Sequence, residues 1–148
     1  MMNKTILLAD DDNDDAEIFQ EALHIADPDF VCHRFDTGAG VLQYLNNAAN
    51  IRPDLIFLDL NMPEMNGWQC LAKLKNLKHF SDIPVVIYTT SSNPRDFEIA
   101  MDLNAHGLIT KPSNPKVLEK ILVLILQKIN TSALGPAVKD AYLLSRDL

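Results

Sequence analysis

Several features that mark particular classes of protein are scarce or missing in this chain. Acidic residues outnumber basic ones by 20 to 13 among 148 residues, which leaves a net charge of −7 and a pI near 4.9. That charge repels phosphate backbones and anionic lipid, so we expect neither nucleic acid nor a membrane as a partner. No basic-then-apolar leader opens the chain and no apolar run reaches about 18 residues, so the sequence predicts a soluble cytoplasmic protein.

Cysteine is scarce as well. The two cysteines, Cys32 and Cys70, lie in apolar runs, which predicts buried free thiols in a reducing compartment rather than a disulfide or a metal-binding pair. The four histidines share no ligand spacing with one another or with a cysteine, so no zinc-type site is expected. Hydrophobic residues make up 47% of the chain, which is enough for the core of one domain.

The chain does contain a regular alternation of two hydrophobic patterns. Short apolar runs predict strands, and the amphipathic stretches between them predict helices. This order is typical of an α/β fold, in which helices cover both faces of a parallel sheet. The predicted strands are 5–9, 31–36, 54–59, 84–89 and 107–110, and the predicted helices are 13–26, 38–49, 66–78, 94–105 and 115–129.

The helix starts carry local signals. Asn93-Pro94 and Asn114-Pro115 each supply a capping side chain followed by proline at the first helical position, where its missing N–H has no consequence. Asp12 is assigned to helix capping or solvent. An apolar stripe along the first helix is expected to pack on the sheet, and it consists of Ile18, Ala22 and Ile25, flanked by Phe19, Leu23 and Ala26.

Polar side chains gather where the predicted strands end. They are Asp10, Asp11 and Asp12 after the first strand, Asp59 at the end of the third, Thr89 at the end of the fourth and Lys111 after the fifth. The carboxyl ends of parallel strands lie at one edge of a sheet, and ligands bind there where the direction of the connections reverses. We therefore expect these side chains to converge on one site.

The composition of that site indicates phosphoryl chemistry. Several carboxylates in an apolar frame need a counter-cation, and an all-oxygen set favours Mg²⁺. A carboxylate nucleophile, a metal, an ammonium and a hydroxyl are what phosphoryl transfer to aspartate requires. Asp59 is the predicted acceptor because it stands alone at its strand end, whereas Asp10 and Asp11 form a pair suited to metal and its waters. Thr89 is predicted to contact the phosphoryl group, and Lys111 to pair with Asp59 before transfer and with the phosphoryl group after it.

With these motifs together, the sequence resembles the receiver domains of two-component response regulators, including the single-domain chemotaxis-type and phytochrome-associated ones. The resemblance covers about residues 4 to 130. It includes the Asp59-Leu60-Asn61-Met62-Pro63 segment with Gly67, and Lys111-Pro112. It implies a doubly wound (βα)5, flavodoxin-like parallel sheet of five strands in the order 2-1-3-4-5. Residues 1–130 would form the receiver domain, and residues 131–148 a C-terminal extension. Its weakly amphipathic part, 137–148, would either dock as a short helix or fray.

Carried over to this sequence, the resemblance implies that Asp59 is phosphorylated by a sensor histidine kinase or a phosphotransfer protein. Asp11 and Asp59 would bind Mg²⁺ through their side chains, Asn61 through its backbone carbonyl, and Asp10 through a bound water. The output would be altered binding to a downstream protein that the sequence does not identify.

One position departs from the family pattern. Leu108 stands where the family often has an aromatic residue that swings inward as Thr89 moves toward the phosphoryl group. Thr89 and Leu108 are therefore the predicted switch residues, with a read-out that differs from the aromatic one. The family also implies a cis peptide bond between Lys111 and Pro112.

The last regular helix is more apolar than the surface of a sheet requires. The run from Ile121 to Leu126 is apolar all round, whereas a helix packed on a sheet needs only one apolar face. We expect either the segment 137–148 or a second subunit to cover its other side. A homodimer through helix 115–129 or the C-terminal segment is thus one of two alternatives, and the segment is too short to hold a helix without docking.

The predicted function is a phosphorylation-gated signalling protein that acts on no separate substrate. The main alternative is a Mg²⁺-dependent phosphohydrolase of the haloacid dehalogenase type, but such enzymes carry a second aspartate two residues after the nucleophile, where this chain has Asn61. A flavin or nucleotide binder of the same fold needs a phosphate-cradling loop after the first strand, where three acids stand instead. A binding module without phosphorylation is disfavoured by the complete set of site residues.

Overall fold

A computed structural model describes residues 4–146, so the ends of the predicted domain and extension, 1–3 and 147–148, lie outside the described residues. The strands are β1 (Thr5–Ala9), β2 (Val31–Phe35), β3 (Leu55–Leu58), β4 (Val85–Thr89) and β5 (Gly107–Thr110). The helices are α1 (Asn13–Ala26), α2 (Gly38–Asn46), α3 (Gly67–Asn76), α4 (Pro94–Asp102), α5 (Pro115–Leu126) and α6 (Leu134–Arg146).

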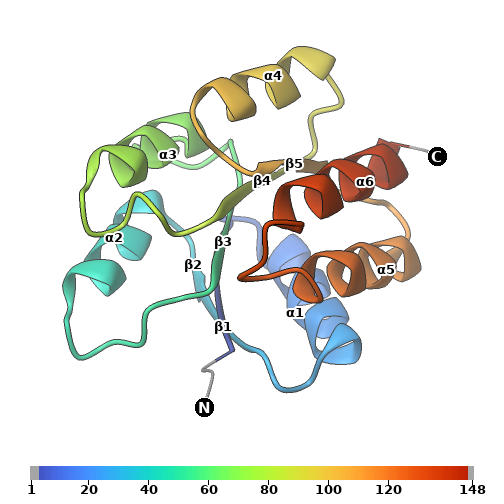
Figure 1. Cartoon of the computed structure of the whole chain (residues 1–148), viewed down its shortest axis with the longest axis horizontal. Helices are drawn as coiled ribbons and strands as arrows, with labels where there is room; N and C mark the ends of the chain where they lie inside the picture. Colours follow the sequence, from blue (N-terminus) through green and yellow to red (C-terminus); the bar gives the residue numbers. More distant parts are fainter. Residues whose placement is uncertain (1–3, 147–148) are drawn as a thin grey trace.

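The sheet confirms the predicted fold class. Its strands are all parallel and follow the order β2-β1-β3-β4-β5, with helices on both faces (Figure 1). The chain leaves β1 toward β2 and later returns to pair β3 on the other side of β1. The reversal between β1 and β3 opens a crevice at their carboxyl ends, which is where this class of sheet binds its ligands.

Each face of the sheet has its own hydrophobic core, because successive strand residues point to opposite faces. On one face, the Phe19 ring of α1 meets Phe57 and Tyr88 with ring centroids 4.9 and 5.3 Å apart, and α5 packs beside it. On the other face, Leu71 of α3 and Ala100 of α4 are fully buried against β3 and β4. The near-continuous apolar strands are therefore explained by burial on both sides.

The helix starts follow their sequence signals. Asn93 and Asn114 cap α4 and α5 with a proline in the first turn, and the Asp12 carboxylate accepts the Asp15 N–H at 3.0 Å at the start of α1. The first helix ends at Ala26 as predicted, but the ends of the other four were predicted too late. The second, fourth and fifth helices stop three residues before the predicted 49, 105 and 129. After α4 the chain turns through Asn104 with φ 67°, a left-handed conformation that ends a helix.

Two expectations are wrong, the first of them only in part. In α1 the buried residues are Ala16, Phe19, Ala22 and Leu23, while Ile18 and Ile25 are 40% and 63% exposed, because the helix turns its Phe19 side toward the sheet. Residues 4–146 contain no cis peptide bond, so the Lys111–Pro112 bond is trans, the form that X–Pro bonds favour by about 0.5–1 kcal/mol.

The two cysteines are free, as predicted, although Cys32 is half-buried and only Cys70 is fully buried. Burial raises the pKa of each thiol to about 11, so both are protonated and unreactive at neutral pH.

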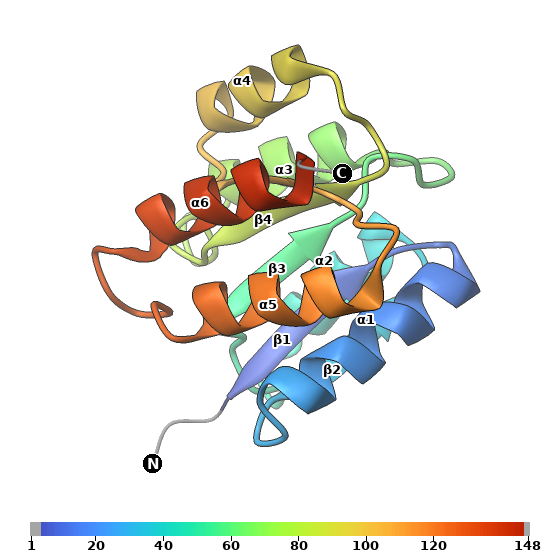
Figure 2. The same ribbon diagram turned by 90° about the vertical axis from the view of Figure 1, so that its right-hand side faces the viewer.

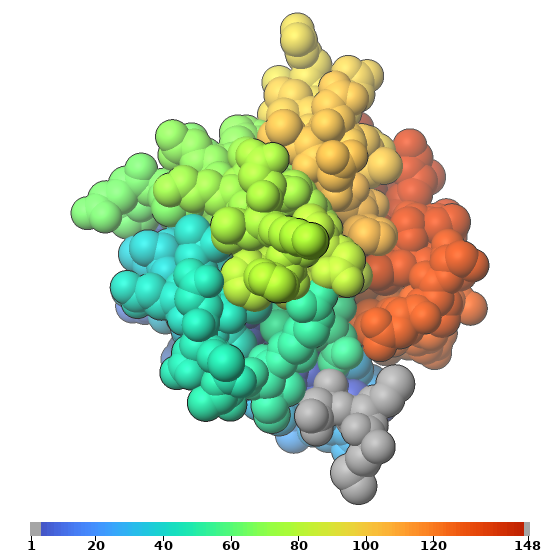
Figure 3. Space-filling model, turned by 60° about the vertical axis from the view of Figure 1, so that its left-hand side comes forward, coloured from blue at the N-terminus to red at the C-terminus, as the bar shows by residue number. Residues whose placement is uncertain are grey.

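The segment after residue 130 forms α6, which lies beside α5 and runs back in the opposite direction (Figure 2). It also packs on the edge strand β5. The space-filling view shows it beside α4 (Figure 3). Leu134, Val138 and Ala141 join the core of the α1 and α5 face, and Tyr142 joins the other core. The helix thus covers the open edge of the sheet, which would otherwise present unpaired backbone groups.

Candidate functional site

The neighbouring strands β1 and β3 each end directly before an aspartate, and the two aspartates lie close together. Ala9 and Leu58, the last residues of β1 and β3, are partners in the sheet register, so Asp10 and Asp59 follow them at the same height. The Asp59 N–H donates to the Ala9 carbonyl at 2.9 Å. Carboxylate oxygens of Asp10, Asp11 and Asp59 all lie within 4.8 Å of one another. One cation, at about 2 to 2.5 Å from each oxygen, would span that distance.

The three acids differ in burial. Asp10 is 0% exposed and Asp59 is 5% exposed, whereas Asp11 lies at the surface. A buried carboxylate needs hydrogen bonds or a counter-charge. Asp10 accepts the Asp12 N–H at 3.0 Å, and Asp59 accepts the Leu60 N–H at 2.8 Å. The site is therefore buried on the Asp10 and Asp59 side and open to solvent beside Asp11.

Lys111 supplies the fixed positive charge. Its Nζ lies 2.8 Å from Asp10 Oδ2, 2.8 Å from Asp15 Oδ2 and 3.6 Å from Asp59 Oδ2, and its side chain is 8% exposed. Burial by itself would lower the pKa of Lys111, but the hydrogen bonds to Asp10 and Asp15 and the nearby charges outweigh it, so the pKa lies above its usual value. Lys111 faces Asp59, but its hydrogen bonds go to Asp10 and Asp15.

Asp59 is the carboxylate whose ionisation the fold disfavours most clearly. Burial raises its pKa from the ordinary 3.8 to about 6, Lys111 lowers it, and the charge of Asp10 raises it. Hydrogen bonds from the backbone of Leu60 and Asn61 lower it further, without cancelling the effect of burial. A cation bound beside Asp59 would favour the ionised, nucleophilic form.

The other predicted site residues take different positions. Thr89 ends β4 and is fully buried, and its Oγ1 accepts the Ser91 N–H at 3.2 Å. Leu108 is buried in the core on the side of α3 and α4, together with Tyr142. Asn61 is exposed next to Asp59, and its backbone N–H bonds the Asp59 carboxylate. Asn61 thus borders the acid cluster through its contact with Asp59, while Leu108 lies in the core.

Sequence reasoning missed two residues that shape the site. Asp15 shares Lys111 with Asp10, as its place one helical turn after Asp11 would have suggested. Arg34 donates from Nε and Nη2 to the Asp10 carbonyl at 3.0 and 2.8 Å, and so fixes the turn after β1. An arginine in the predicted edge strand gave no direct signal of this contact.

Gly67 allows the loop after Asp59 to fold tightly. A Cβ at this position would lie 2.3 Å from the Asp59 carbonyl oxygen, a distance that no side chain tolerates. The Gly67 N–H donates to the Leu60 carbonyl at 3.0 Å. The start of α3 is thereby held directly against the loop that carries Asp59 and Asn61.

The donor set fits a hard divalent cation. Asp10, Asp11, Asp15 and Asp59 bring four carboxylates to a site with one ammonium, Lys111. All candidate ligand atoms are oxygens, which favours Mg²⁺ or Mn²⁺ over the softer metals.

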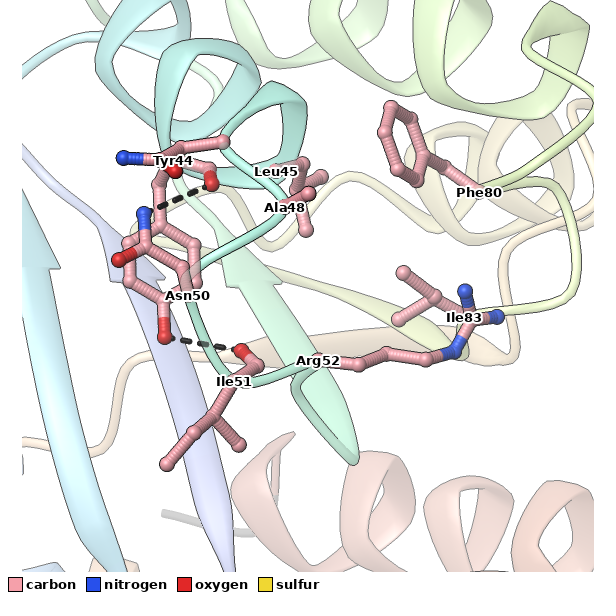
Figure 4. A pocket seen from close by; sticks show the side chains of 9 residues that line it. Tyr44, Leu45, Ala48, Asn50, Ile51, Arg52, Phe80 and Ile83 are labelled. Atoms are coloured by element: carbon pink, nitrogen blue, oxygen red, sulfur yellow. Dashed lines mark hydrogen bonds between the residues drawn. The ribbon is translucent and has the colours of Figure 1, made fainter.

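A small cavity of about 80 Å³ lies at the other end of the sheet, among the segments that lead into β3 and β4. Its wall is tied together by two hydrogen bonds, from Tyr44 Oη to the Ile51 carbonyl and from Asn50 Nδ2 to the Tyr44 carbonyl, both at 2.9 Å (Figure 4). Arg52, Phe80 and Ile83 line the opposite side. This cavity shares no residue with the acid cluster.

A parallel sheet of this order, with an acid cluster and a buried lysine at the carboxyl ends of its strands, defines the class of doubly wound, flavodoxin-like proteins. The family model described as the response regulator receiver domain matches residues 6–123. The chain belongs to this family, which confirms the resemblance in the sequence. It is a receiver domain of the two-component response regulators, a family of signalling proteins.

Several relatives are similar along most of this chain. Response regulator Rcp1 of Synechocystis is 33% identical over 123 residues, which are 80% of this chain and 84% of that protein. The chemotaxis protein CheY1 of Helicobacter pylori is 32% identical over 78 residues, 53% of this chain and 63% of that protein. A probable cyclic di-GMP phosphodiesterase of Vibrio cholerae is 27% identical, and this chain spans only 30% of its length.

Solved structures agree with the fold and the family. The Mn²⁺-bound form of Rcp1 has a TM-score of 0.73 at 33% identity, covering 82% of this chain and 91% of that one. The phosphorylated cyanobacterial phytochrome response regulator RcpA has the same TM-score at 35% identity, with coverage of 82% and 90%. The comparisons give no support to the phosphohydrolase alternative. Within residues 4–146, no helix combines the length and apolar character needed to cross a membrane.

Proposed function

We propose that Asp59 is the residue of this receiver that accepts the phosphoryl group, from a sensor histidine kinase or a phosphotransfer protein. The observation that supports this most directly is its position. Asp59 is the buried carboxylate that faces both the Asp10 and Asp11 pair and the Lys111 ammonium, 3.6 Å away. Asp10 is fully buried and already bonded to Lys111, and Asp11 is exposed, so neither is as well placed to act as nucleophile.

We further propose that Mg²⁺ is held by the side chains of Asp11 and Asp59, by the backbone carbonyl of Asn61, and by Asp10 through water. The 4.8 Å cluster of carboxylate oxygens supports this set. When bound, Mg²⁺ would neutralise charge on the phosphoryl oxygens and favour ionised Asp59. RcpA was captured phosphorylated and Rcp1 with Mn²⁺, which supports the same chemistry here.

The residues of the chain have separate roles in the transfer. An Asp59 carboxylate oxygen forms a bond to phosphorus while the bond between phosphorus and the donor's histidine nitrogen breaks, and the electron pair stays on that nitrogen. Lys111 offsets the added negative charge, and the Thr89 hydroxyl donates a hydrogen bond to a phosphoryl oxygen. We propose that Thr89 then acts with Leu108, in the core below, as the switch. The protein acts on no separate substrate in this scheme, although it would assist its own dephosphorylation.

The remaining parts of the proposal concern partners and organisation. Since histidine kinases draw their phosphoryl groups from ATP, we place the protein in the cytoplasm. We divide the chain into a receiver domain, residues 1–130, and an extension, residues 131–148, because the family match ends at 123 and the chain turns at Asn130 with φ 64°. The output is binding to a downstream protein.

A homodimer through α5 or the extension is a second proposal. It is supported by the side chains of Val123 and Leu124 in α5, which stay 37% and 38% exposed.

The acceptor is tested by incubation with Mg²⁺ and acetyl phosphate, followed by intact mass. The wild type should gain the mass of one phosphoryl group, and Asp59→Asn should gain none. Asp29→Asn, which changes an exposed aspartate far from the site, is the matched control and should behave as the wild type. A wild type that gains no mass, or an Asp59→Asn variant that gains it equally, refutes the assignment. Chelation of Mg²⁺ should abolish the gain.

A further inference from the structure

Helix α6 covers the edge strand β5 through specific contacts along its length. Val138 lies over Gly107, whose φ of 147° suits only glycine, and a Cβ there would lie 2.7 Å from Val138 Cγ1. The Tyr142 ring lies against Phe97 of α4, with centroids 4.4 Å apart. In the last turn, Ser145 Oγ accepts the backbone N–H of Thr110 at 3.2 Å. The helix is therefore fitted to this surface rather than resting loosely on it.

A chain of hydrogen bonds joins that last turn to the proposed phosphorylation site. Thr110, whose N–H bonds Ser145, donates from its own Oγ1 to the Ser91 carbonyl at 3.0 Å. The Ser91 N–H in turn donates to Thr89 Oγ1 at 3.2 Å. Thr110 also precedes Lys111, whose N–H donates to the Thr89 carbonyl at 2.7 Å. Three hydrogen bonds thus separate the Thr89 hydroxyl from α6, and every residue on the path is buried or half-buried.

The Thr89 hydroxyl is the point at which a phosphoryl group would act on these bonds. In this structure its oxygen is held by the Ser91 N–H. A phosphoryl group on Asp59 would offer strong acceptor oxygens to the same hydroxyl, and turning toward them moves the oxygen away from Ser91. Ser91 and the loop around it would then shift. This shift would weaken the hydrogen bond from Thr110 Oγ1 to the Ser91 carbonyl. The disturbance reaches α6 at Ser145.

We propose that α6 is a read-out element of this receiver: phosphorylation of Asp59 weakens the attachment of its last turn to β5 through Thr89, Ser91, Thr110 and Ser145. This inference rests on the proposed function and adds a regulated element to it. A helix of 13 residues is at the margin of stability in water, so α6 depends on its docking contacts. The loss of one net hydrogen bond changes a docking equilibrium about 2- to 10-fold.

The release of α6 would uncover a defined surface. Beneath the helix lie Gly107 and Ile109 of β5, the ring of Phe97 and the inner side of α5. This surface already accepts an amphipathic helix, since α6 occupies it. The partner that fits it is therefore another amphipathic helix, presented by a downstream protein.

The test is residue-resolved amide hydrogen exchange by NMR on the full chain with Mg²⁺, with and without excess acetyl phosphate. Intact mass on the same sample gives the extent of phosphorylation. The amides of Thr110 and of the last turn of α6 should exchange about 2- to 10-fold faster in the phosphorylated protein. The Gly40 amide, bonded to Thr37 Oγ1 at 3.0 Å at the start of α2, is the internal control and should not change.

Variants test the route without phosphodonor. Thr89→Ala removes the oxygen that holds Ser91, and should speed exchange at Thr110 and in α6. Its matched control, Thr37→Ala, should speed exchange only in α2. Ser145→Ala should speed exchange at Thr110 and remove any further response of that amide to acetyl phosphate, whereas Ser132→Ala, in the exposed loop before α6, should leave both unchanged.

The outcomes separate the two proposals. Phosphorylated protein with unchanged exchange in α6 overturns the inference and leaves Asp59 as acceptor. A protein that takes up no phosphoryl group overturns both, and the mass shows this directly. An α6 that responds to phosphorylation but not to Thr89→Ala overturns the hydrogen-bond route.

Discussion

Replacement of Asp59 by asparagine should stabilise the metal-free protein at neutral pH. Burial and Asp10 together outweigh Lys111 and raise the pKa of Asp59 from 3.8 to about 6. At about 1.4 kcal/mol per tenfold change in acidity, ionised Asp59 opposes folding by about 3 kcal/mol. Asparagine removes this charge and can still accept the Leu60 N–H. Because Lys111 keeps Asp10 and Asp15 as partners, we expect a gain of about 1 to 3 kcal/mol at pH 7.5.

The gain should depend on pH in a defined direction. The folded protein binds the Asp59 proton more tightly than the unfolded chain does. The stability that comes from this proton is complete below pH about 4 and is lost as the pH rises through about 6. The wild type should therefore approach Asp59→Asn in stability at pH 4 to 5 and fall behind it between pH 5 and 7.5.

Urea unfolding with a chelator, followed by the fluorescence of Trp68, measures this difference. Asp29→Asn is the control and should track the wild type at every pH. Mg²⁺ at ten times its dissociation constant should narrow the difference, since it adds about 1.4 kcal/mol to a protein that binds it. Equal stability of wild type and Asp59→Asn at all pH values without metal would refute the claim that burial disfavours the charge.

Three further substitutions test the frame of the site. Lys111→Met should destabilise the protein by about 3 to 5 kcal/mol at pH 7.5, because it leaves the fully buried Asp10 carboxylate without its counter-charge; a loss below about 1 kcal/mol in urea unfolding would contradict this. Gly67→Ala should cost about 1 to 3 kcal/mol and weaken Mg²⁺ binding, measured by titration, because its Cβ would press on the Asp59 carbonyl. Asn66→Ala, which removes the α3 capping box, should cost about 1 kcal/mol in urea unfolding and leave Mg²⁺ binding unchanged, so equal effects on the metal would count against the close approach at Gly67.

The fold was largely predictable because its signals are local. Fully apolar strands and asparagine-proline helix starts are visible in the sequence, and parallel strands need helical crossovers. The helix ends were less visible, since neither proline nor glycine directly follows α4 or α5. There the end is set by a turn at Asn104 or near Asn130, and by the packing of the next segment, rather than by a breaker residue.

The site was predictable to a different degree for each residue. Asp10, Asp59 and Lys111 could be predicted because each directly follows a buried strand. A charged residue at that position lies at the carboxyl edge of the sheet. The place of Asp15 one helical turn after Asp11 puts it near the acid pair, but its sharing of Lys111 with Asp10 also depends on how α1 leaves the sheet. The contact of Arg34 is also invisible in the sequence, because it runs from β2 to the backbone carbonyl of Asp10, directly after the neighbouring strand β1.

Helix α6 shows why a sequence can indicate that a helix face is buried without identifying the segment that buries it. The apolar run in α5 needs to be buried, and a short amphipathic segment follows it. The sequence does not decide whether this segment or a second subunit buries that run. The choice depends on how single residues pack. Val138 lies above Gly107, where any other residue would leave no room, and Ser145 Oγ accepts the N–H of Thr110. Because Thr110 stands next to Lys111, a helix placed by these contacts also borders the proposed phosphorylation site. A change at Asp59 can then alter the edge of the sheet without a rearrangement of the core.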